Sequence, residues 1–570
     1  MRDLEIENHN DLNKWVYTLD AFKQGKVSED AFRAFRLANG IYGQRQGGTN
    51  QMVRVKIPGG VVTSEQLVAL GKIANEYSRG WGHITTRQNI QFHYVQLDDI
   101  AQVMHELHRV GLTTREACGD TVRNTQACHL AGACPLEKLN VQGWADITHE
   151  HFLRNPISQR LPRKFKINFS GCDVDCGQAL INDAGVIATV NDDGEAGFRV
   201  YVGGGLGANP HPAQLLEDFT PKQDLLPTLE ALLRMFDRVG NRDNKLRARL
   251  KWFVQEHGID ELRRQVFRDR ELLLASSTFP SPIEVRDEPT LSNDYQKPTA
   301  VGVPVELIGK TRHERWDENN VVYGAKDGTV SVNVHIPLGD LTASSFDELA
   351  SIADTTDTIV KLTNRQNVVF CGMRVEDVDY VKERLERALL AEPAVQLSRD
   401  VVACPGTDTC NLGLTQSRGL ADAITAALEN LGLAEVDGVK INISGCSNSC
   451  GQHHIADIGF HGIEKRHEGK SIPGYNVFLG GGLKDGEVVF GKKVFKVAAR
   501  HAPDLVVELV QSYVLEREFR QSFAEWLEEN SDFVDKLSAV FKDRPITGDD
   551  YVDFGEKDVY AASVGASECR

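Results

Sequence analysis

Four cysteines in the second half of the chain have a spacing that suits metal or redox chemistry. Cys404 and Cys410 lie in CPGTDTC, and Cys446 and Cys450 lie in GCSNSC, so the pattern is C-x5-C…C-x3-C. Zinc sites usually have closer C-x2-C pairs or include histidine. Four thiolates from two loops are typical of an iron–sulfur cube, in which each cysteine binds one iron. Because glycine and proline flank the ordered pairs, we prefer this interpretation to four scattered core thiols.

The first half of the chain contains a second set of cysteines with the same spacing. In order, these residues align with the four above: Cys128, Cys134, Cys172 and Cys176. They are either relics of a duplication, packed as small apolar side chains, or ligands of a second [4Fe-4S] cluster. Eight of the 11 cysteines belong to the two sets. Unligated thiols have little physical reason to keep this spacing, so we favour a second cluster.

Both cysteine sets belong to an internal repeat that covers most of the sequence. Segments 51–95 and 329–372 each predict an alternating strand, a turn, an amphipathic helix and a second strand that ends in T-x-R-Q-N. Another helix follows each segment. The pairs RNTQAC and RDVVAC, and then the two KIN…GC segments, continue the match at an offset of 274 to 278 residues. We therefore predict two homologous halves, related by a pseudo-twofold axis, in an α+β (mixed α/β) fold.

Composition excludes several classes of protein. A chain of 570 residues is too long for one core, so several domains are expected. The net charge of −17 argues against a general nucleic-acid binder, and any anion site must gather its positive charge locally. The N-terminus MRDLEIENHN is charged and no apolar stretch reaches membrane-spanning length, so we predict a cytoplasmic protein with reduced thiols. The runs GGGLG and GGGLK lack G-x-G-x-x-G spacing and predict tight backbone turns rather than a dinucleotide site.

The combined motifs resemble the siroheme-containing sulfite and nitrite reductases. The resemblance rests on CPGTDTC with GCSNSC, TTRQN, MVRVKIP and LPRKFK, and it extends from about Ile41 to Trp526. It implies a siroheme coupled to a [4Fe-4S] cluster, in which the thiolate of Cys450 also ligates the siroheme iron. It also implies a ferredoxin-like subdomain and a larger siroheme and cluster domain in each half. The expected parts are 1–112 and 113–280 in the first half, a linker at 281–300, and 301–395 and 396–570 in the second half.

The resemblance also implies roles for particular side chains. Four cations would surround a substrate anion: Arg54, Arg123, Lys164 and Lys166. The segment HITTRQNIQFH would contact the siroheme through Thr85, Thr86, Arg87, Gln91 and His93. Taken singly, such arginines are most often solvated or salt-bridged, and such a histidine is most often structural. The combination of motifs favours the functional roles.

The expected activity is the six-electron reduction of sulfite to sulfide. The pair Lys164 and Lys166 suits an anion that can carry two negative charges, which favours sulfite. The alternative is the six-electron reduction of nitrite to ammonia, since nitrite-preferring relatives typically have asparagine at the second position. A third possibility is an electron-transfer or structural iron–sulfur protein without siroheme. The full set of four cations argues against it, because an electron carrier needs no such pocket.

Electrons must come from a partner, because no flavin or nicotinamide segment is evident. A ferredoxin or an NADPH-dependent flavoprotein would serve. A basic helix at 237–252 could dock such an acidic donor, although a solvated helix, or one that faces siroheme carboxylates, explains the charges equally well. Cys371 and Cys569 are interpreted as ordinary thiols. Cys118 could react with a neighbour such as Tyr42, but we expect an inert thiol.

In the second half, the corresponding anion pocket is incomplete. Arg399 and Lys440 align with Arg123 and Lys166, but asparagine and glycine stand where the other two cations would be, at Asn333 and Gly438. We therefore expect that this second site, with or without a second siroheme, is structural or relays electrons and does not reduce the substrate.

Overall fold

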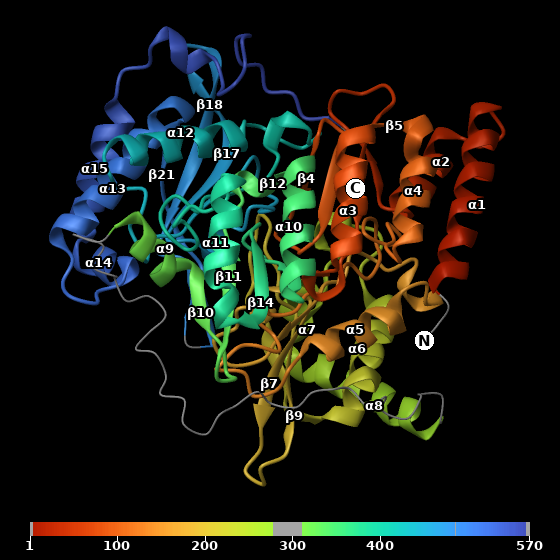
Figure 1. Cartoon of the computed structure of the whole chain (residues 1–570). Coiled ribbons are helices and arrows are strands. Elements are labelled where there is room, and N and C mark those ends of the chain that lie inside the picture. Colours follow the sequence, from red (N-terminus) through yellow and green to blue (C-terminus); the bar gives the residue numbers. More distant parts are fainter. Residues whose placement is uncertain (1–3, 277–310, 485, 566–570) are drawn as a thin grey trace.

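The computed structural model describes residues 4–276, 311–484 and 486–565 (Figure 1). The predicted linker at 281–300 and the tail thiol Cys569 lie outside this described part. Three large hydrophobic cores form within it. One core is shared by residues 15–112 and 316–391, a second lies within 122–273, and a third lies within 401–541. The first core therefore joins the two halves, whereas the other two belong to one half each.

The shared core lies against two five-stranded antiparallel sheets. The first half supplies β1 (Ile41–Gly43), β2 (Asn50–Val55), β3 (Val61–Val62), β4 (Trp81–Ile84) and β5 (Ile90–Gln96). The second half supplies β10 (Val321–Tyr323), β11 (Thr329–Val334), β12 (Asp340–Thr342), β13 (Ile359–Leu362) and β14 (Val368–Arg374). The sheet orders are β1-β2-β5-β4-β12 and β10-β11-β14-β13-β3. Each half thus donates one short strand to the sheet of the other, which joins the two ferredoxin-like subdomains into one unit.

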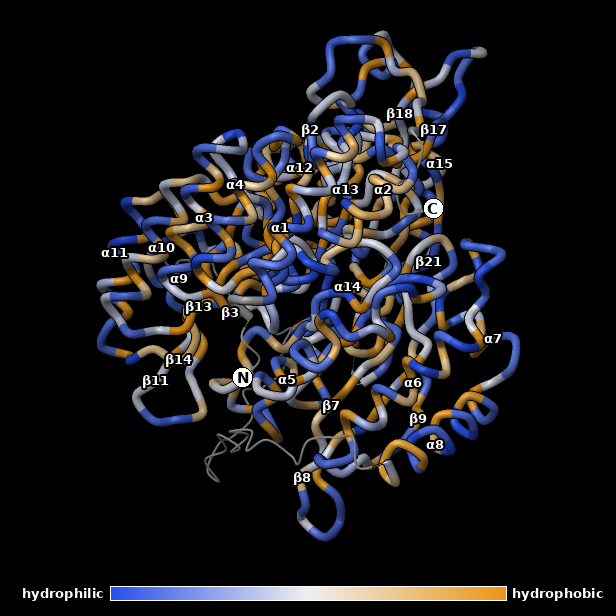
Figure 2. Tube along the Cα trace, turned by 90° about the vertical axis from the view of Figure 1, so that its right-hand side faces the viewer, coloured by the Kyte–Doolittle hydropathy of each residue, from blue (hydrophilic) through white to orange (hydrophobic). Residues whose placement is uncertain are grey.

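One layer of helices covers both sheets. The helices of this unit are α1 (Leu4–Lys23), α2 (Glu29–Ala38), α3 (Ser64–Tyr77), α4 (Ile100–Arg109), α9 (Arg312–Asn320), α10 (Ala343–Thr356) and α11 (Val378–Arg387). α4, α3, α10 and α11 lie in a row, and α1 packs against α4 (Figures 1 and 2). Helix α3 begins with a capping box between Thr63 and Gln66, and it buries Leu67, Leu70 and Ile73 at helical spacing.

The T-x-R-Q-N motifs lie in turns, which corrects the sequence-based prediction of a strand that ends in this motif. In the first half, β4 ends at Ile84 and β5 begins at Ile90, so the motif forms the turn between two antiparallel strands. The same turn separates β13 and β14 in the second half. Gln88 and Gln366 adopt left-handed backbone conformations, with φ of 54° and 65°. The alternating pattern concealed these turns because apolar residues resume directly after the motif.

The two larger domains each contain a sheet that begins with parallel strands and continues with antiparallel ones. In the first half the order is β6 (Ile167–Ser170), β7 (Ala184–Val190), β8 (Ala196–Val202) and β9 (Gln214–Pro221). In the second half it is β15 (Val402–Ala403), β16 (Ile441–Ser444), β17 (Ile458–His467), β18 (Lys470–Leu479) and β21 (Lys492–Ala498), beside the hairpin of β19 (Gly482–Lys484) and β20 (Glu487–Val489). The pairs β6–β7 and β16–β17 are parallel, and both are followed by an antiparallel strand.

Helices pack on these larger sheets. In the first half they are α5 (Gln142–Phe152), α6 (Leu225–Val239), α7 (Leu250–His257) and α8 (Ile259–Ala275). In the second half they are α12 (Ser417–Asn430), α13 (Ala502–Glu516), α14 (Phe523–Glu529) and α15 (Ser531–Asp543). None of the described helices is long and apolar enough to cross a membrane.

A reciprocal contact marks the pseudo-twofold axis between the halves. Gln178 and Gln452 stand at equivalent positions of the two repeats. The Nε2 of Gln178 donates to the Oε1 of Gln452 at 3.0 Å, and the Nε2 of Gln452 donates to the Oε1 of Gln178 at 2.6 Å. Each glutamine follows the last cysteine of its set by two residues. The predicted α+β fold with two homologous halves is therefore confirmed, and the two cysteine sets flank the axis.

The basic stretch at 237–252 is not a single helix, so that prediction is wrong. Helix α6 ends at Val239 and α7 begins only at Leu250, with a short 3-10 turn between them. Lys245 contacts Asp120 at 2.8 Å, and Arg249 contacts Asp183 at 2.7 Å. The asparagine and glycine residues of GNRDN interrupt the helix, and Lys245 and Arg249 bind acids of the same half, although Lys245 stays partly exposed.

Candidate active site

The four cysteines of the second half lie on two loops at the carboxyl ends of β15 and β16. The Cys404 amide donates to the carbonyl of Ile443 at 3.2 Å, and the amide of Gly445 donates to the sulfur of Cys404 at 3.1 Å. Hydrogen bonds to cluster sulfurs help to set the reduction potential of an iron–sulfur centre. Burial and the neighbouring Cys450 raise the pKa of Cys410 to about 12, so these two thiols, from different loops, lie near each other.

This donor set fits a cube-shaped cluster. The described residues contain no group of three or more His, Cys, Asp or Glu side chains arranged around one metal ion. Zinc draws its sulfur ligands to about 2.3 Å from a single ion. In a [4Fe-4S] cluster, each thiolate binds a different iron, so the four sulfurs surround a volume and do not meet at a point. Four cysteines without disulfides, on two loops that also supply amide donors to sulfur, match that requirement.

The turn at 85–89 connects the ferredoxin-like unit to both cysteine sets. The Oγ1 of Thr86 donates to the carbonyl of Cys450 at 3.1 Å. The buried side chain of Gln88 donates to the carbonyls of Ala127 and Leu362, at 2.9 and 3.0 Å. The Oγ1 of Thr85 accepts the amide of Arg87 at 3.1 Å, so it stabilises the turn itself. One turn therefore contacts the last cysteine of one half and the residue that precedes Cys128 in the other.

The predicted anion-site arginines lie close together. Arg54, on β2, donates to the side-chain oxygen of Gln91 at 3.1 Å, which pairs two of the predicted residues across β2 and β5. Arg54 and Arg123 both donate to the carbonyl of Ala117, at 3.5 and 3.1 Å. Arg123 also donates to the carbonyl of Gly119 at 2.8 Å. The two guanidinium groups are therefore held by backbone oxygens that cannot shift independently of the fold.

The two lysines enter the same region from the segment that leads into β6. Phe165, between Lys164 and Lys166, forms a parallel bridge with Val122, and its carbonyl accepts the amide of Arg123 at 2.9 Å. Burial lowers the pKa of Lys166 well below its ordinary value, and the charges of Arg87, Arg249 and Lys164 lower this pKa further. The structure thus brings both lysines close to Arg123, as the resemblance implies.

Arg87 lies at the centre of this group of cations. It donates to the side-chain oxygens of Asn168 and Asn182, at 3.3 and 3.1 Å, and to the carbonyl of Asn124. Burial lowers the pKa of Arg87 to about 9, and Arg123 is the largest electrostatic contributor to that shift. Such a group of buried cations is costly without a counter-charge, because desolvation and mutual repulsion both oppose it. A bound polyanion would supply the counter-charge.

Several buried polar atoms in this region also lack partners that a bound polyanion would supply. Within the described part of the chain, the Nε atoms of Arg54 and Arg87 and both ring nitrogens of His93 are buried without a hydrogen-bond partner. The His93 ring lies between Trp81 and His83, at 5.5 and 6.3 Å between centroids. Buried donors without partners are rare in folded proteins. A carboxylate-rich tetrapyrrole fits these donors, because it would bring acceptors and negative charge to the cations.

Sequence reasoning missed three residues that shape this pocket. Arg249 donates to the carboxylate of Asp183 through its Nε and Nη2 atoms, at 3.2 and 2.7 Å, and Asp183 also accepts the amide of Lys166 at 3.0 Å. Lys251 donates to the carbonyl of Leu206 at 3.0 Å, and burial lowers its pKa to about 8. Arg249 and Lys251 were predicted only as members of a basic helix that could dock a donor, lie in solvent or face siroheme carboxylates, and their charge alone could not decide among these.

The glycine run after β8 forms the predicted tight turn. Gly203 has a φ of 78°, and a Cβ on Gly204 would lie 2.6 Å from the carbonyl oxygen of Asn182. A Cβ on Gly205 would lie 2.7 Å from the guanidinium of Arg249. The prediction of a tight turn is confirmed, and it lets the backbone approach the cation pocket closely.

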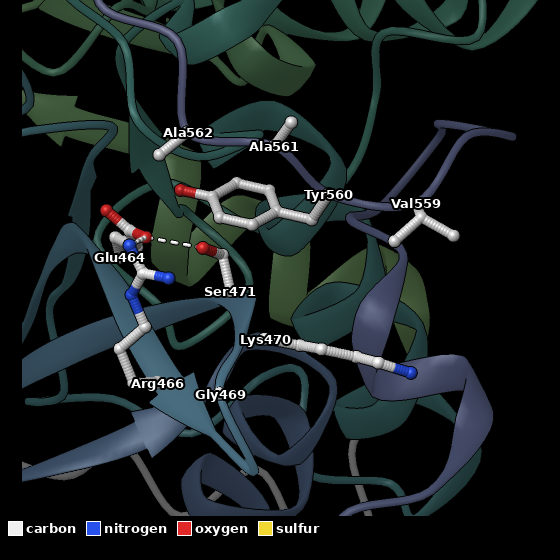
Figure 3. Close-up of a pocket in the computed structure, with 9 residues that line it drawn as sticks. All are labelled: Glu464, Arg466, Gly469, Lys470, Ser471, Val559, Tyr560, Ala561 and Ala562. Atoms are coloured by element: carbon white, nitrogen blue, oxygen red, sulfur yellow. Dashed lines mark hydrogen bonds and ion pairs between the residues drawn. The ribbon is translucent and has the colours of Figure 1, made fainter.

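A separate surface pocket of about 470 Å³ lies between the β17–β18 hairpin and the C-terminal segment (Figure 3). Glu464, Arg466 and Ser471 line one side of it and Tyr560 the other, and the Glu464 carboxylate accepts the Ser471 hydroxyl. The Tyr560 hydroxyl donates to the carbonyl of Leu414 at 2.9 Å. This pocket contains none of the predicted site residues, so we assign it no part in the chemistry.

The sequence matches two family models, each in both halves. "Nitrite and sulphite reductase 4Fe-4S domain" matches residues 118–272 and 395–529, and "Nitrite/Sulfite reductase ferredoxin-like half domain" matches 42–110 and 323–388. The chain belongs to the nitrite and sulfite reductase family. It is therefore an oxidoreductase that reduces nitrite or sulfite by six electrons and uses siroheme and a [4Fe-4S] cluster. The family identification based on the motifs is confirmed.

Individual relatives in this family carry both activities in their names. The chain is 31% identical to "Assimilatory ferredoxin-dependent nitrite reductase" of Haloferax mediterranei, over 86% of this chain and 84% of that protein. It is 28% identical to "Sulfite reductase [ferredoxin] 1" of Mycolicibacterium paratuberculosis, over 83% of this chain and 81% of that protein. Among solved structures, the NirA protein of Mycobacterium tuberculosis superposes with a TM-score of 0.75 at 26% identity, over 90% and 92% of the two chains.

Proposed function

We propose that this protein reduces nitrite to ammonia with electrons from a ferredoxin. The observation that carries the proposal is its similarity to named ferredoxin-dependent nitrite reductases, at 31% identity over 86% of the chain for the Haloferax mediterranei protein and 31% over 80% for that of Synechococcus elongatus. The named sulfite reductases reach 28%. The balanced reaction consumes six electrons and eight protons per nitrite and releases ammonium and two waters. The names of these relatives include ferredoxin, and none of them includes an NADPH-dependent flavoprotein.

The electrostatics of the pocket agree with a singly charged substrate. The choice of sulfite rested on two full charges at Lys164 and Lys166. However, burial and the cations around Lys166 lower the pKa of its amine well below its ordinary value. A lysine with a lowered pKa holds its positive charge less strongly than an exposed lysine does, so the pair attracts a doubly charged anion less strongly than two ordinary lysines would. Sulfite remains the second candidate, because both lysines are present and named sulfite reductases are also similar to the chain.

The residues of the chain have distinct roles in this proposal. The siroheme and its coupled cluster, held by Cys404, Cys410, Cys446 and Cys450, supply electrons one at a time when bound. Arg54 and Arg123 attract and orient the anion, because the shared carbonyl of Ala117 fixes both guanidinium groups. Lys166 donates a proton, since its lowered pKa makes the ammonium a stronger acid. The turn at 85–89 holds the cofactor against both halves.

The test is to measure kcat/KM for nitrite and for sulfite with purified holoenzyme and a reduced ferredoxin. Ammonium and sulfide are quantified together with the electrons consumed. The proposal predicts six electrons per nitrite and a kcat/KM at least about tenfold higher for nitrite, a difference of about 1.4 kcal/mol in transition-state stabilisation. A higher kcat/KM for sulfite would overturn the choice of anion. Turnover with NADPH and a flavoprotein but not with ferredoxin would overturn the choice of donor.

A further inference from the structure

We propose that Cys128, Cys134, Cys172 and Cys176 bind a second [4Fe-4S] cluster, which is not linked to a siroheme. The proposal does not depend on which anion is reduced. It rests on three observations: the cysteine loops of the first half keep the geometry of those in the second half, the same turn motif anchors them, and the adjoining pocket, formed by the second half, does not suit a polyanion.

The loops of the two sets make the same backbone contacts. The amide of Gly171 donates to the sulfur of Cys128 at 3.2 Å, and in the second half the amide of Gly445 donates to the sulfur of Cys404 at 3.1 Å. The Cys128 amide donates to the carbonyl of Phe169 at 3.1 Å, which matches the 3.2 Å contact of Cys404 with Ile443. An amide that donates to sulfur stabilises a thiolate, and a metal-bound thiolate is the form that needs it.

The two C-x3-C loops also keep the same strained conformations. Asp175 and Ser449 precede the last cysteines and have φ of 55° and 56°. Gln178 and Gln452 have φ of 58° and 60°. Left-handed conformations cost free energy for residues other than glycine and persist where the surroundings require them. A loop that had lost its ligand would be free to relax, so this shared strain favours a loop that still binds a cluster.

The T-x-R-Q-N turn of each half anchors both cysteine sets. Gln366 donates to the carbonyls of Ile84 and Ala403, both at 3.1 Å, as Gln88 does to those of Leu362 and Ala127. Ala127 and Ala403 directly precede the first cysteines. Asn364 donates to the carbonyl of Cys176 at 2.6 Å, just as Thr86 donates to that of Cys450. The first-half loops are therefore positioned as firmly as the loops that the family uses for its cluster.

The thiols of the first set gather in a partly buried site. Cys128 and Cys172 are buried, with 6% and 7% of their surfaces exposed, and the thiols of Cys134 and Cys172 lie near each other. The buried Glu137 accepts the amide of Gly132 at 2.8 Å and holds the C-x5-C loop closed. The four sulfurs therefore lie on two loops, as in the second half, with Cys128 and Cys172 buried and Cys134 and Cys176 partly exposed.

The adjoining pocket of the second half does not suit a second siroheme. Arg365, the counterpart of Arg87, contacts the carboxylate of Asp400 at 2.9 Å. In the first half, Arg87 instead contacts the side chains of asparagines. Arg399, the counterpart of Arg123, contacts the carboxylates of Glu392 and Glu429. Asn333 and Gly438 replace the other two cations. Local acids already neutralise these arginines, so the binding of a carboxylate-rich ring there would gain little free energy. The second cluster would therefore have no siroheme beside it.

The first test is the inorganic content of the purified holoprotein with its siroheme fully loaded. Two clusters and one siroheme give about nine irons and about eight acid-labile sulfides per chain, whereas one cluster and one siroheme give about five and four. A fully loaded preparation with about five irons and four sulfides would overturn the proposal and leave the first set as relics.

A matched pair of variants locates the second cluster. Cys134→Ser is expected to lower acid-labile sulfide by about half and to leave the siroheme absorption unchanged. Cys371→Ser is the control, because the Cys371 sulfur lies 4.0 Å from the carbonyl of Ala131 in the same loop but belongs to neither set. It should keep all the sulfide. Full sulfide in Cys134→Ser, or equal losses in both variants, would contradict the assignment; if Cys134→Ser does not fold, the wild-type iron and sulfide contents decide alone.

Discussion

Gly451, directly after Cys450, allows the close approach that shapes the cluster loop. A Cβ at this position would lie less than 3.0 Å from the backbone carbonyl of Ile443, which belongs to β16 and cannot move aside easily. We predict that Gly451→Ala displaces the loop and prevents stable binding of the siroheme and its cluster.

The expected loss of cofactor binding is the sum of two free-energy costs. Overpacking a well-packed site costs about 1–3 kcal/mol. Displacement of the loop also breaks the hydrogen bond from the Gly451 amide to the Oγ of Ser444, 3.1 Å long, which is worth about 1 kcal/mol. A total of about 2–4 kcal/mol lies below the usual stability of about 5–15 kcal/mol, so the chain still folds. Each 1.4 kcal/mol is a tenfold change, so cofactor retention should fall roughly 30- to 700-fold.

The assay is the siroheme absorbance per chain after purification, with circular dichroism to confirm folding. Gly548→Ala is the control, because a Cβ at Gly548 meets no atom within 4 Å. The control should keep its full siroheme content, and Gly451→Ala should keep less than about a tenth of the wild-type content. A folded Gly451→Ala protein with full siroheme content would refute this reasoning about the loop.

Three further predictions concern the pocket and the buried Lys56, whose amine donates to the carbonyl of Val122, directly before Arg123, at 3.4 Å. Lys166→Asn should lower kcat/KM for sulfite more than for nitrite, because it removes one cation; equal losses would contradict the link between cation number and substrate charge. Thr86→Val should lower siroheme content about fivefold by removing the hydrogen bond to the Cys450 carbonyl, whereas Thr86→Ser should not. Burial lowers the pKa of Lys56 to about 8 from 10.5, so the folded chain binds fewer protons than the unfolded chain between these values. Stability relative to Lys56→Met should therefore rise by about 2–3 kcal/mol between pH 7 and pH 10 in urea unfolding; no change would contradict the shift.

Much of the fold could be predicted because the internal repeat can be recognised in the sequence. The two cysteine sets, the T-x-R-Q-N motifs and the family resemblance all indicated paired α+β halves. The exchange of β3 and β12 between the sheets could not be predicted, because strands of two and three residues carry no periodic signal. The T-x-R-Q-N turns were missed because a turn through Gln88 and Gln366 requires left-handed conformations that these residues rarely adopt.

The sequence predicted which residues form the site, but not the contacts that hold them in place. The motifs named Arg54, Arg123 and Lys166, and the structure brings them together, while their roles stay predictions. The pairing of Arg249 with Asp183 was not predicted, because the two residues lie 66 positions apart in the sequence. The Gln178–Gln452 pair could have been found, because both cysteine sets end in C-G-Q. Glutamine at equivalent positions of a twofold repeat can bond to its own copy, since it carries both a donor and an acceptor.

The central claim is that only one of the two pseudo-equivalent pockets binds the anion, with cations from the first half and the siroheme-linking cysteine from the second. A nitrite titration of the siroheme absorption band in the oxidised holoenzyme tests this claim most directly, with Arg123→Gln and its repeat counterpart Arg399→Gln as the matched variants. The claim predicts a siroheme band in all three proteins, a Kd for nitrite at least about tenfold weaker in Arg123→Gln, and a wild-type Kd in Arg399→Gln. A wild-type Kd in Arg123→Gln, an equal loss in Arg399→Gln, or the absence of a siroheme band in the wild-type protein would contradict it.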